Sequence, residues 1–479
     1  MTKPLRLIFV VDGLQKRSIN STDTPCLHRL QTEGTECTTA VTVVPALTRP
    51  AAAALATACL PGATGIIGNH VYAPGHGVAS TGSVTDLNVL AAIYGAVVDV
   101  PTIGAFLAER GHRMAVIGTG SAGCTHLLYP DASTSGGTVV RASASADEPL
   151  TTPATLQARI VHAIGPRPAA TGETASLDLL TWASDVAATL MVPDPATALL
   201  VFWSGEPDSA QHHHGIDHPL TRRAIRAADQ ALQRLLDAAS QHGRPIDVIV
   251  TSDHGARTTG ATARPDLDAY RDLGPAATSL AFVPNDGALL VYRTADQVPV
   301  DDLARWALDQ AWAGTVYADD DRTSPVIPLA TAGCKHPTRS PDLLVTMGSI
   351  ATDRGPATWN TATVSAEQDP TTYALKATHG TSHRDDLEIP LILHGPSFRS
   401  ATRSEIPAGL VDVGATMAYL VTGETAPHWD GRVLHETLRL APGRTDPPAP
   451  TVTAGTVAHT DMGVAYVGDS TYLLGVPAC

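Results

Sequence analysis

The 479-residue chain contains few aromatic residues and few lysines. Aromatic side chains make up 4% of it, and only four of its 32 basic residues are lysines. A nucleotide substrate should need an aromatic surface on which its base can stack. The low aromatic content leaves few candidates for such a surface.

Long hydrophobic runs and paired cysteines are also missing. The apolar run Leu7–Val11 is shorter than the roughly 7–15 apolar residues of a signal peptide, and no run approaches the length of a membrane helix. We therefore expect a cytoplasmic protein that makes no contact with a membrane. The six cysteines form no CxxC pair, which predicts free thiols and excludes a zinc–cysteine site; they are Cys26, Cys37, Cys59, Cys124, Cys334 and Cys479.

Acidic residues outnumber basic ones, 47 to 32, which gives a formal charge of −15. The mean field of such a chain repels a polymer of phosphates, so we expect no nucleic-acid partner. To handle a small phosphate, the protein would need local positive charge from metal ions or from arginine. Hydrophobic residues make up 43% of the chain, which is enough for a large packed core.

Buried strands alternate with helices over most of the chain. Leu5–Val11 is a continuous β-prone run, as expected for a strand buried on both faces of a parallel sheet. Similar runs predict strands at 41–44, 114–118, 198–203, 247–251 and 390–394. Helices are predicted at 24–34, 51–58, 102–110, 220–240 and 411–422. This alternation predicts an α/β fold whose core sheet carries helices on both faces.

The sequence changes character between about residues 256 and 373. Two predicted strands (287–293 and 343–347) and one amphipathic helix (301–310) lie among loops rich in Pro and Gly. We interpret 256–373 as an inserted, smaller α+β cap on a metal-binding catalytic core formed by 1–255 and 374–440. Residues 441–479 are predicted to form a linker followed by one or two short strands.

Polar side chains follow the predicted core strands at their carboxyl ends, where ligands bind in open α/β sheets. Asp and His supply the oxygen and nitrogen ligands of zinc-like ions. The i,i+4 spacing of Asp208 and His212 puts both on one helix face, and Gly255 permits the turn that brings its two preceding residues inward. Each feature is weak alone, but the whole set at strand ends indicates a metal site: Asp12, Thr48 as a predicted N-cap, Asp208, His212, Asp253, His254 and His379.

Seven stretches together resemble the type I phosphodiesterase/nucleotide pyrophosphatase branch of the alkaline phosphatase superfamily. They span most of residues 5–400, and the set is specific although no single stretch is. The resemblance implies a hydrolase with an alkaline-phosphatase-like core sheet. The stretches are FVVDGL (9–14), TPCLHRLQTEG (24–34), TVVPALTRP (42–50), LPGATGIIGN (60–69), WSGEPDSAQHHHG (203–215), VIVTSDHG (248–255) and ATHGTSHRDDLEIPLILHG (377–395).

The resemblance also implies two divalent metal ions, with zinc as the expected metal. Thr48 would be the nucleophile, and Asn69 would bind a phosphate oxygen. His383 competes with His379, which is preferred because the family ligand precedes a glycine. Manganese or iron would fit the same ligand types. One ion would be held by Asp12, Thr48, Asp253 and His254, and the other by Asp208, His212 and His379.

The chemistry of these residue types agrees with that assignment. A threonine hydroxyl is a weak nucleophile until a metal or a base lowers its pKa. At a helix N-terminus, Thr48 would also lie beside free backbone N–H groups suited to an anion. Two ions roughly 4 Å apart can hold the attacking and leaving oxygens of an in-line displacement. We therefore expect a phosphothreonine intermediate.

Two departures from the family pattern bear on the substrate. The family usually has Pro-Asn-His after the nucleophile, whereas Pro50 is followed by two alanines, and Thr64 stands where a His is common. Tyr72 is a candidate stacking surface for a nucleotide, although a loop or core role is the simpler interpretation. The departures leave the metal ligands intact and the nucleotide as substrate open.

The preferred function is hydrolysis of small phosphate diesters or pyrophosphates. The second is C–P bond hydrolysis, as in phosphonoacetate hydrolase, whose carboxylate-binding lysines are missing from Ile117–Leu127. A phosphomonoesterase is the third, and an inactive metal-binding relative is the non-enzymatic alternative. A sulfatase is disfavoured because no Cys/Ser-x-Pro-x-Arg motif surrounds Thr48. The expected partner is a small phosphate or phosphonate; a homodimer is one candidate for the oligomeric state, which the sequence leaves open.

Overall fold

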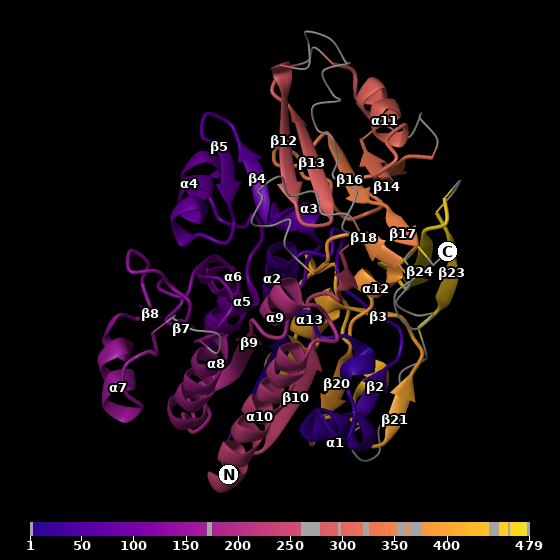
Figure 1. The fold of residues 1–479 in the computed structure, drawn as a ribbon. Helices are drawn as coiled ribbons and strands as arrows, with labels where there is room; N and C mark the ends of the chain where they lie inside the picture. The colour runs from indigo at the N-terminus through magenta and orange to yellow at the C-terminus, as the bar shows by residue number, and fades with distance from the viewer. Residues whose placement is uncertain are drawn as a thin grey trace.

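A nine-stranded sheet forms the centre of the molecule in the computed structural model (Figure 1). The structure describes residues 3–169, 175–259, 278–295, 298–319, 325–351, 361–363, 376–439, 450–457 and 460–476. β1 lies in the middle, parallel to β9 and β10, while β20 is antiparallel to β10. In spatial order the strands are β21 (Thr402–Ser404), β2 (Thr35–Cys37), β20 (Leu391–His394), β10 (Ile246–Thr251), β1 (Leu5–Val11), β9 (Thr197–Ser204), β6 (Arg113–Gly118), β7 (Thr138–Arg141) and β8 (Thr151–Thr152).

Helices cover both faces of this sheet, as predicted. Successive strand residues point to opposite faces, so Leu7 and Phe9 of β1 pack with α1, α7, α8 and α10, whereas Ile8 and Val10 pack with α2, α4, α5, α6 and α13. The helices are α1 (Pro25–Glu33), α2 (Thr48–Thr57), α3 (Pro61–Thr64), α4 (Val84–Tyr94), α5 (Ile103–Glu109), α6 (Ala122–Leu127), α7 (Thr155–Ala163), α8 (Ala175–Val186), α9 (Asp208–His214), α10 (Pro219–Gln241), α11 (Val300–Leu308), α12 (Arg384–Leu387) and α13 (Leu410–Thr422).

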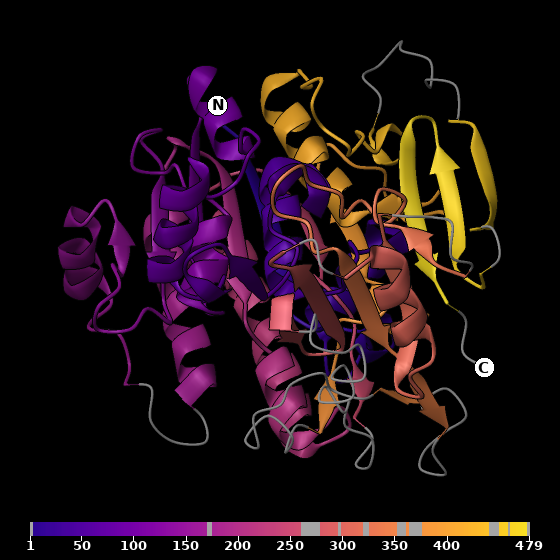
Figure 2. The same cartoon turned by 90° about the horizontal axis from the view of Figure 1, so that it is seen from above.

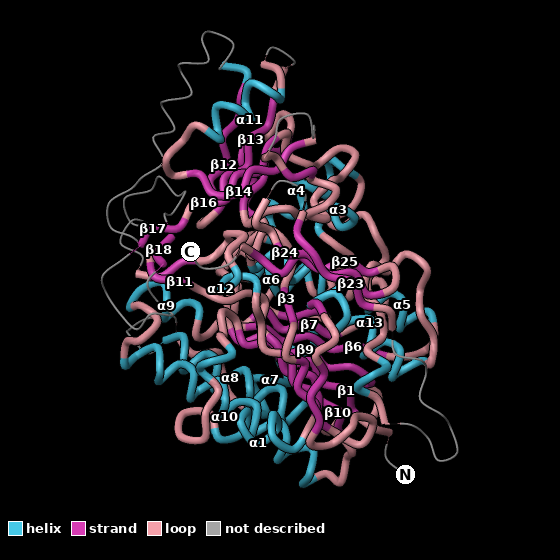
Figure 3. Tube along the Cα trace, turned by 90° about the vertical axis from the view of Figure 1, so that its right-hand side faces the viewer, coloured by secondary structure: helices cyan, strands magenta, loops and turns pink. Residues whose placement is uncertain are grey.

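A second, five-stranded sheet stands above the first, and we call it the cap sheet (Figures 1 and 3). Alternate residues of β13 face two different cores. Leu290 and Tyr292 pack toward Ile67 of the main body, while Leu289 and Val291 pack against α11. The domain boundaries given above remain a prediction. The cap strands are, in spatial order, β12 (Leu280–Asn285), β13 (Ala288–Arg293), β16 (Leu343–Met347), β14 (Ala313–Ala318) and β15 (Ile327–Pro328).

The C-terminal residues form a three-stranded antiparallel sheet, where one or two strands were predicted (Figure 2). Its strands are β23 (Val452–Thr456), β24 (Gly463–Val467) and β25 (Ser470–Gly475), and residues 441–449 of the predicted linker lie outside the described residues. The sheet is attached to α13 through buried polar groups. The Tyr472 hydroxyl donates to Asp412 Oδ2 over 2.9 Å and accepts from Arg432 Nε over 3.1 Å.

Shorter strand pairs complete the structure. β4 pairs with β5, β11 with β19, β17 with β18, and β3 with β22. Their bounds are β3 (Ala40–Val41), β4 (His70–Ala73), β5 (Gly77–Ser80), β11 (Arg257–Thr258), β17 (Ser349–Ala351), β18 (Thr361–Thr363), β19 (Ala377–Thr378) and β22 (Ala408–Gly409). The predicted strand at 41–44 is wrong beyond Val41. Val43 and Val44 are buried by packing rather than by pairing in a sheet, and the Thr42 N–H donates to the Leu387 carbonyl.

Two further expectations concern the cysteines and contact with a membrane. Cys26, Cys37, Cys59, Cys124 and Cys334 are free and buried, as predicted, and Cys479 lies outside the described part. Within the described ranges, none of the helices combines the length and the apolar character that crossing a membrane requires. The predicted location in the cytoplasm stays a prediction.

Candidate metal and active site

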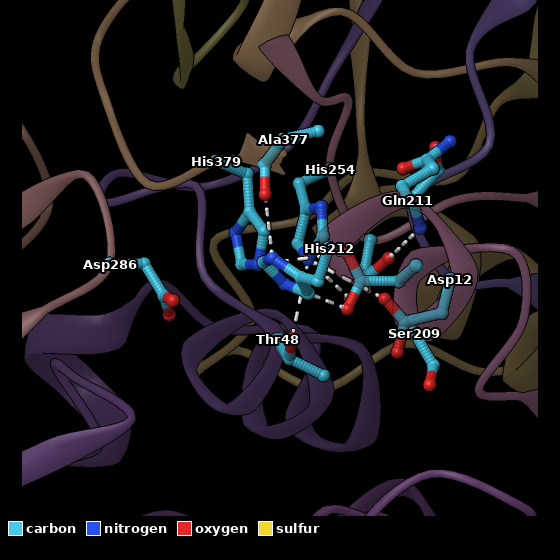
Figure 4. Close-up of polar contacts among 12 residues, drawn as sticks. Asp12, Thr48, Ser209, Gln211, His212, His254, Asp286, Ala377 and His379 are labelled. Atoms are coloured by element: carbon cyan, nitrogen blue, oxygen red, sulfur yellow. Dashed lines mark hydrogen bonds and ion pairs between the residues drawn. The ribbon is translucent and has the colours of Figure 1, made fainter. Parts of the chain in front are cut away.

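The ends of three neighbouring strands bring most of the predicted site residues together (Figure 4). Asp12 follows β1, Asp253 and His254 follow β10, and Asp208 begins α9 just after β9. The Asp12 N–H donates to the Ser204 carbonyl, and the Asp208 N–H donates to the Asp12 carbonyl, over 3.0 and 3.1 Å. These backbone bonds tie the two strand ends to each other, so the side chains that follow them share one edge of the sheet.

Asp12, Asp253 and His254 form what we call the deep group. All are at most 4% exposed, and one ligand atom from each lies within 4.8 Å of the others. His254 Nε2 is 3.2 Å from Asp253 Oδ2 and 3.5 Å from Asp12 Oδ1. The other oxygen of each carboxylate is satisfied, because Trp203 Nε1 donates to Asp12 Oδ2 and the Gly13 N–H donates to Asp253 Oδ1.

His212, Asp286 and His379, together with Asp208, form the outer group. The ligand atoms of the first three lie within 4.8 Å of one another. Asp208 contacts His212 Nε2 through Oδ2 over 3.2 Å and His379 Nε2 through Oδ1 over 3.8 Å. The His379 ring stacks on His254, with 3.5 Å between ring centroids, so the two groups adjoin.

The three histidines of both groups are held in the same way. Each directs Nδ1 at a backbone carbonyl over 2.8 Å: His212 at Ala377, His254 at Gly255 and His379 at Ala46. Because a carbonyl only accepts, Nδ1 carries the proton, and Nε2 presents a lone pair to the site when the ring is neutral. This is the usual arrangement of histidines that bind a metal ion.

The carboxylates also have the character expected around a cation. Within the described residues, Asp12 Oδ1, Asp208 Oδ1 and Asp253 Oδ2 are buried without a hydrogen-bond donor. Electron-rich oxygen and nitrogen atoms thus face one another at short range, an arrangement that protons or metal ions must neutralise. The residues present therefore fit divalent cations with mixed oxygen and nitrogen ligands.

The shifted pKa values follow from the same crowding. Burial, followed by the charges of Asp253 and Asp208, raises the pKa of Asp12 well above its usual range. Burial and then Asp208 raise the pKa of Asp253 to about 6. Burial acts to lower the pKa of His212, but the Asp208 carboxylate outweighs it and raises this pKa to about 9. A metal-free site would thus retain protons that bound ions would displace.

Thr48 is the first residue of α2, and the N-cap is Leu47 rather than Thr48, which corrects the predicted cap. Thr48 Oγ1 lies 3.2 Å from His254 Nε2, so its side chain faces the site instead of capping the helix. The N-terminus of α2 also offers fewer free backbone N–H groups to an anion than expected. The Arg49 N–H donates to Asn69 Oδ1 over 3.1 Å, and Pro50 has no N–H. Among the first three residues of α2, the Thr48 N–H therefore remains to donate to an anion.

Asp286 is the site residue that the sequence pattern did not select. It lies in the turn between β12 and β13, next to the predicted strand at 287–293, and accepts a hydrogen bond from Asn69 Nδ2 over 3.1 Å. An acidic residue in an Asn-Asp-Gly turn is normally assigned to the turn itself. Only the docking of the cap sheet brings it to the outer group, and the sequence carried no signal for that docking.

The remaining candidates lie elsewhere. His383 Nδ1 accepts the Asp385 N–H over 3.1 Å and thereby caps α12, while its competitor His379 lies in the site. The ring of Tyr72 packs against Tyr292 of the cap sheet, with 5.8 Å between centroids, as the simpler interpretation predicted. His213 is exposed at the surface of α9 and belongs to neither group.

A cavity of about 390 Å³ opens beside Asp12, Thr48 and Asp208. None of the described residues that line it is aromatic, so it offers no surface for stacking a base. Two arginines, Arg49 and Arg167, contribute positive charge, and the other polar lining residues are Thr119, Ser121, Ser143, Ser176, Glu206 and Ser209. The local positive charge that an acidic phosphate-handling protein needs is thus available from arginine at this cavity.

The sheet, its helices and this site define a hydrolase with an alkaline-phosphatase-like fold. A family model described as type I phosphodiesterase / nucleotide pyrophosphatase matches residues 6–312. The chain belongs to this family of hydrolases, and its membership supports phosphodiester hydrolysis as its activity.

Solved structures agree on the fold. The chain is similar to murine ectonucleotide pyrophosphatase / phosphodiesterase 5, with a TM-score of 0.62 and 17% identity over 91% of this chain and 100% of that one. An inactive variant of the same mouse protein in complex with AMP gives a TM-score of 0.63 at the same identity and coverage. No curated protein matches the chain in sequence.

Proposed function

We propose that the chain is a dinuclear-metal phosphodiesterase that hydrolyses small phosphate diesters or pyrophosphates through a phosphothreonine at Thr48. The observation that carries the proposal is the position of Thr48 Oγ1, 3.2 Å from His254 Nε2 and beside carboxylates without donors. Asp12, Thr48, Asp253 and His254 would hold one ion. Asp208, His212 and His379 would hold the other.

When bound, two divalent ions would lower the pKa of the Thr48 hydroxyl and of a water molecule and would offset the charge of the phosphoryl oxygens. Thr48 Oγ1 gives up its proton and forms the new bond to phosphorus as the bond to the leaving oxygen breaks, and the leaving oxygen takes up a proton. Water then attacks the phosphothreonine, which releases phosphate or a phosphate monoester and restores the hydroxyl.

Fixed groups orient the reacting atoms. The Asn69 carboxamide is set by the Arg49 N–H on its oxygen side, so the second proton of Nδ2 can donate to a phosphoryl oxygen. Trp203 holds Asp12 in place through the indole N–H. Such preorganisation supplies much of the rate enhancement in phosphoryl transfer, because the groups need not reorganise in the transition state.

The cavity limits the substrate class. Its volume of about 390 Å³ suits a small organic phosphate, and its described lining lacks an aromatic ring that would favour a nucleobase. A substrate with a second anionic group beside the scissile bond, such as a pyrophosphate, would meet Arg49 and Arg167. The proposal therefore favours compact anionic esters over nucleotides.

A second candidate is hydrolysis of a carboxylated phosphonate such as phosphonoacetate. Arg49 and Arg167 support this candidate, because they supply positive charge at the cavity. They could thus take the place of the lysines that are absent from Ile117–Leu127. A comparison of rates separates the candidates. The substrates would be bis(p-nitrophenyl) phosphate, p-nitrophenyl phosphate, inorganic pyrophosphate, a dinucleotide and phosphonoacetate, each with and without chelator.

The test of the nucleophile uses Thr48→Ala and Thr48→Ser in the zinc-loaded chain. Thr48→Ala is expected to retain the overall fold and to lose at least about 10³-fold in turnover, because the covalent step has no acceptor oxygen. Thr48→Ser restores a hydroxyl and is expected to recover part of the rate. Intact-mass analysis after rapid quenching should show a phosphorylated wild-type chain, and substantial turnover by Thr48→Ala would exclude the mechanism.

A further inference from the structure

The turn between β12 and β13 carries a carboxylate into the metal site from the cap sheet. A ligand atom of Asp286 lies within 4.8 Å of those of His212 and His379, two residues assigned to the second ion. Figure 4 shows Asp286 on the side of these rings that lies away from Asp12. The site is therefore approached from two directions, by the core strands on one side and by the cap turn on the other.

Backbone contacts fix this turn against the site. The Gly287 N–H donates to the His379 carbonyl over 2.7 Å, and a Cβ at Gly287 would lie 2.5 Å from that oxygen, so the approach requires glycine. Asn285 brackets the backbone of His70, accepting its N–H over 2.7 Å and donating to its carbonyl over 3.0 Å. Asp286 itself adopts a positive φ of 48°.

A positive φ is uncommon outside glycine, but Asp is among the residues that adopt it most readily, and the two-residue hairpin loop Asp286-Gly287 requires it at its first residue. An ordinary hairpin turn would leave its acidic residue in water. Here the turn is held between His70 of β4 and the His379 carbonyl. The Asp286 carboxylate is half-buried beside the imidazoles of His212 and His379. The backbone contacts of this turn thus hold the Asp286 carboxylate beside His212 and His379.

We propose that Asp286 is a fourth protein ligand of the ion bound by Asp208, His212 and His379. The inference rests on the dinuclear site of the proposed function and adds a residue to it. Two carboxylates and two imidazoles form a ligand set suited to zinc, manganese or iron. The two negative charges would also balance a divalent ion without help from the solvent.

The additional ligand changes how this ion can act. A catalytic zinc site usually has three protein ligands and keeps a further position for water or substrate. With Asp286 in place, a substrate oxygen must either displace that carboxylate or enlarge the ligand set. Asp286 also accepts the Asn69 amide, so the phosphate-binding group and the ion are linked through one carboxylate.

The test compares metal affinities of the full-length wild type with Asp286→Asn and Asp286→Gly. Both replacements tolerate a positive φ, so the turn should fold, and thermal melting would confirm it. Zn²⁺ affinity at each site is measured by competition with a chelator. We expect the weaker-binding ion to be held at least about tenfold less tightly in both variants, with the other ion unchanged.

Asp309→Asn is the matched control, because it removes an exposed carboxylate at the end of α11 in the same cap and should leave both affinities unchanged. Co²⁺-loaded protein gives a second readout, since loss of one oxygen ligand should alter the visible absorption of one ion only. Asp286 could instead serve only to position Asn69, whose amide it accepts. In that case both Asp286 variants would keep the wild-type Zn²⁺ affinity while turnover fell as it does in Asn69→Ala. That outcome would overturn the proposal.

Failure of the inference is distinguishable from failure of the proposed function. If the wild type binds two ions and the Asp286 variants bind them equally well, only the fourth ligand is excluded. If the wild type binds fewer than two ions per chain, the dinuclear site itself is excluded and the fourth ligand with it. Weaker binding at one site in both variants supports the two together.

Discussion

The two halves of the site are built differently, although both offer oxygen and nitrogen ligands to a cation. The deep group comes from the ends of adjacent core strands, and its side chains are almost fully buried. The outer group draws on α9, on the loop before α12 and on the cap turn. Its Asp208 and His212 side chains are 14% and 16% exposed.

The two groups also differ in how their negative charge can be neutralised without a bound metal ion. In the deep group, burial and the neighbouring carboxylates raise the pKa values of Asp12 and Asp253, so without a cation this pair of side chains favours holding a proton. In the outer group an ion pair between Asp208 and His212 can substitute, and solvent reaches both side chains. We therefore expect the deep ion to be structural as well as catalytic, and the outer ion to exchange.

Removal of metal is expected to give the largest effect. A chelator should abolish turnover, and the outer ion should leave first, because its ligands are the more exposed ones. Metal content per chain and rate, followed together during dialysis, test this order. Release of both ions in one step, or full activity with less than one ion per chain, would remove the distinction between the halves.

Single-ligand variants should separate the halves next. Asp253→Asn is expected to weaken the deep ion by about 100-fold or more and to lower the melting temperature of the metal-loaded chain, because the variant loses stabilisation by that ion. Asp208→Asn should weaken the outer ion and leave the deep ion bound. The measurement is metal competition with calorimetry on both variants, and a loss of both ions from Asp208→Asn would contradict the comparison.

The metal-free chain should show a pH dependence that belongs to the outer half. Asp208 raises the pKa of His212 from its ordinary value to about 9, so the pair stabilises the fold below about pH 6.5 and this contribution is lost as the pH rises through 9. Asp208→Asn should thus be less stable than the wild type by about 1–3 kcal/mol near pH 6. The difference, measured by denaturant unfolding, should shrink toward pH 10, whereas a difference independent of pH would assign another role to Asp208.

The smallest effect is expected beside the outer group. His213 is exposed and its Nδ1 faces the Ser209 carbonyl, so His213→Ala should change turnover less than about twofold and stability by less than about 0.5 kcal/mol. Kinetics and thermal melting check this. A marked loss of the outer ion in this variant would bring His213 into the site and extend the outer group along α9.

The deep half could be foreseen from the sequence more fully than the outer half. A β-prone run that ends in Asp12, and another that ends in Asp253 and His254, place their side chains at one edge through the parallel pairing of β1 and β10 alone. His379 was preferred over His383 on the glycine that follows it. Asp286 could not be foreseen, because its contact with His212 and His379 depends on how the cap sheet packs on the core. The sequence of a hairpin turn does not indicate how the hairpin packs on another domain.

The N-terminus of α2 shows a second limit. The sequence Thr-Arg-Pro carries a good N-cap signal, yet Leu47 is the N-cap and the Thr48 hydroxyl points to His254. Local preference was outweighed by the polar surroundings of Thr48. A cap residue drawn into a site in this way is a case where a broken local rule marks function.

The order of residues along the chain also sets an order of assembly during synthesis. The deep group is complete once residue 254 has emerged, and its strands β1, β9 and β10 can pair by then. The outer group must wait for Asp286 and for His379, more than a hundred residues later in the chain. Because domains tend to fold from the N-terminus as they are made, the nascent protein would hold a ready place for its first cation well before it can accept the second.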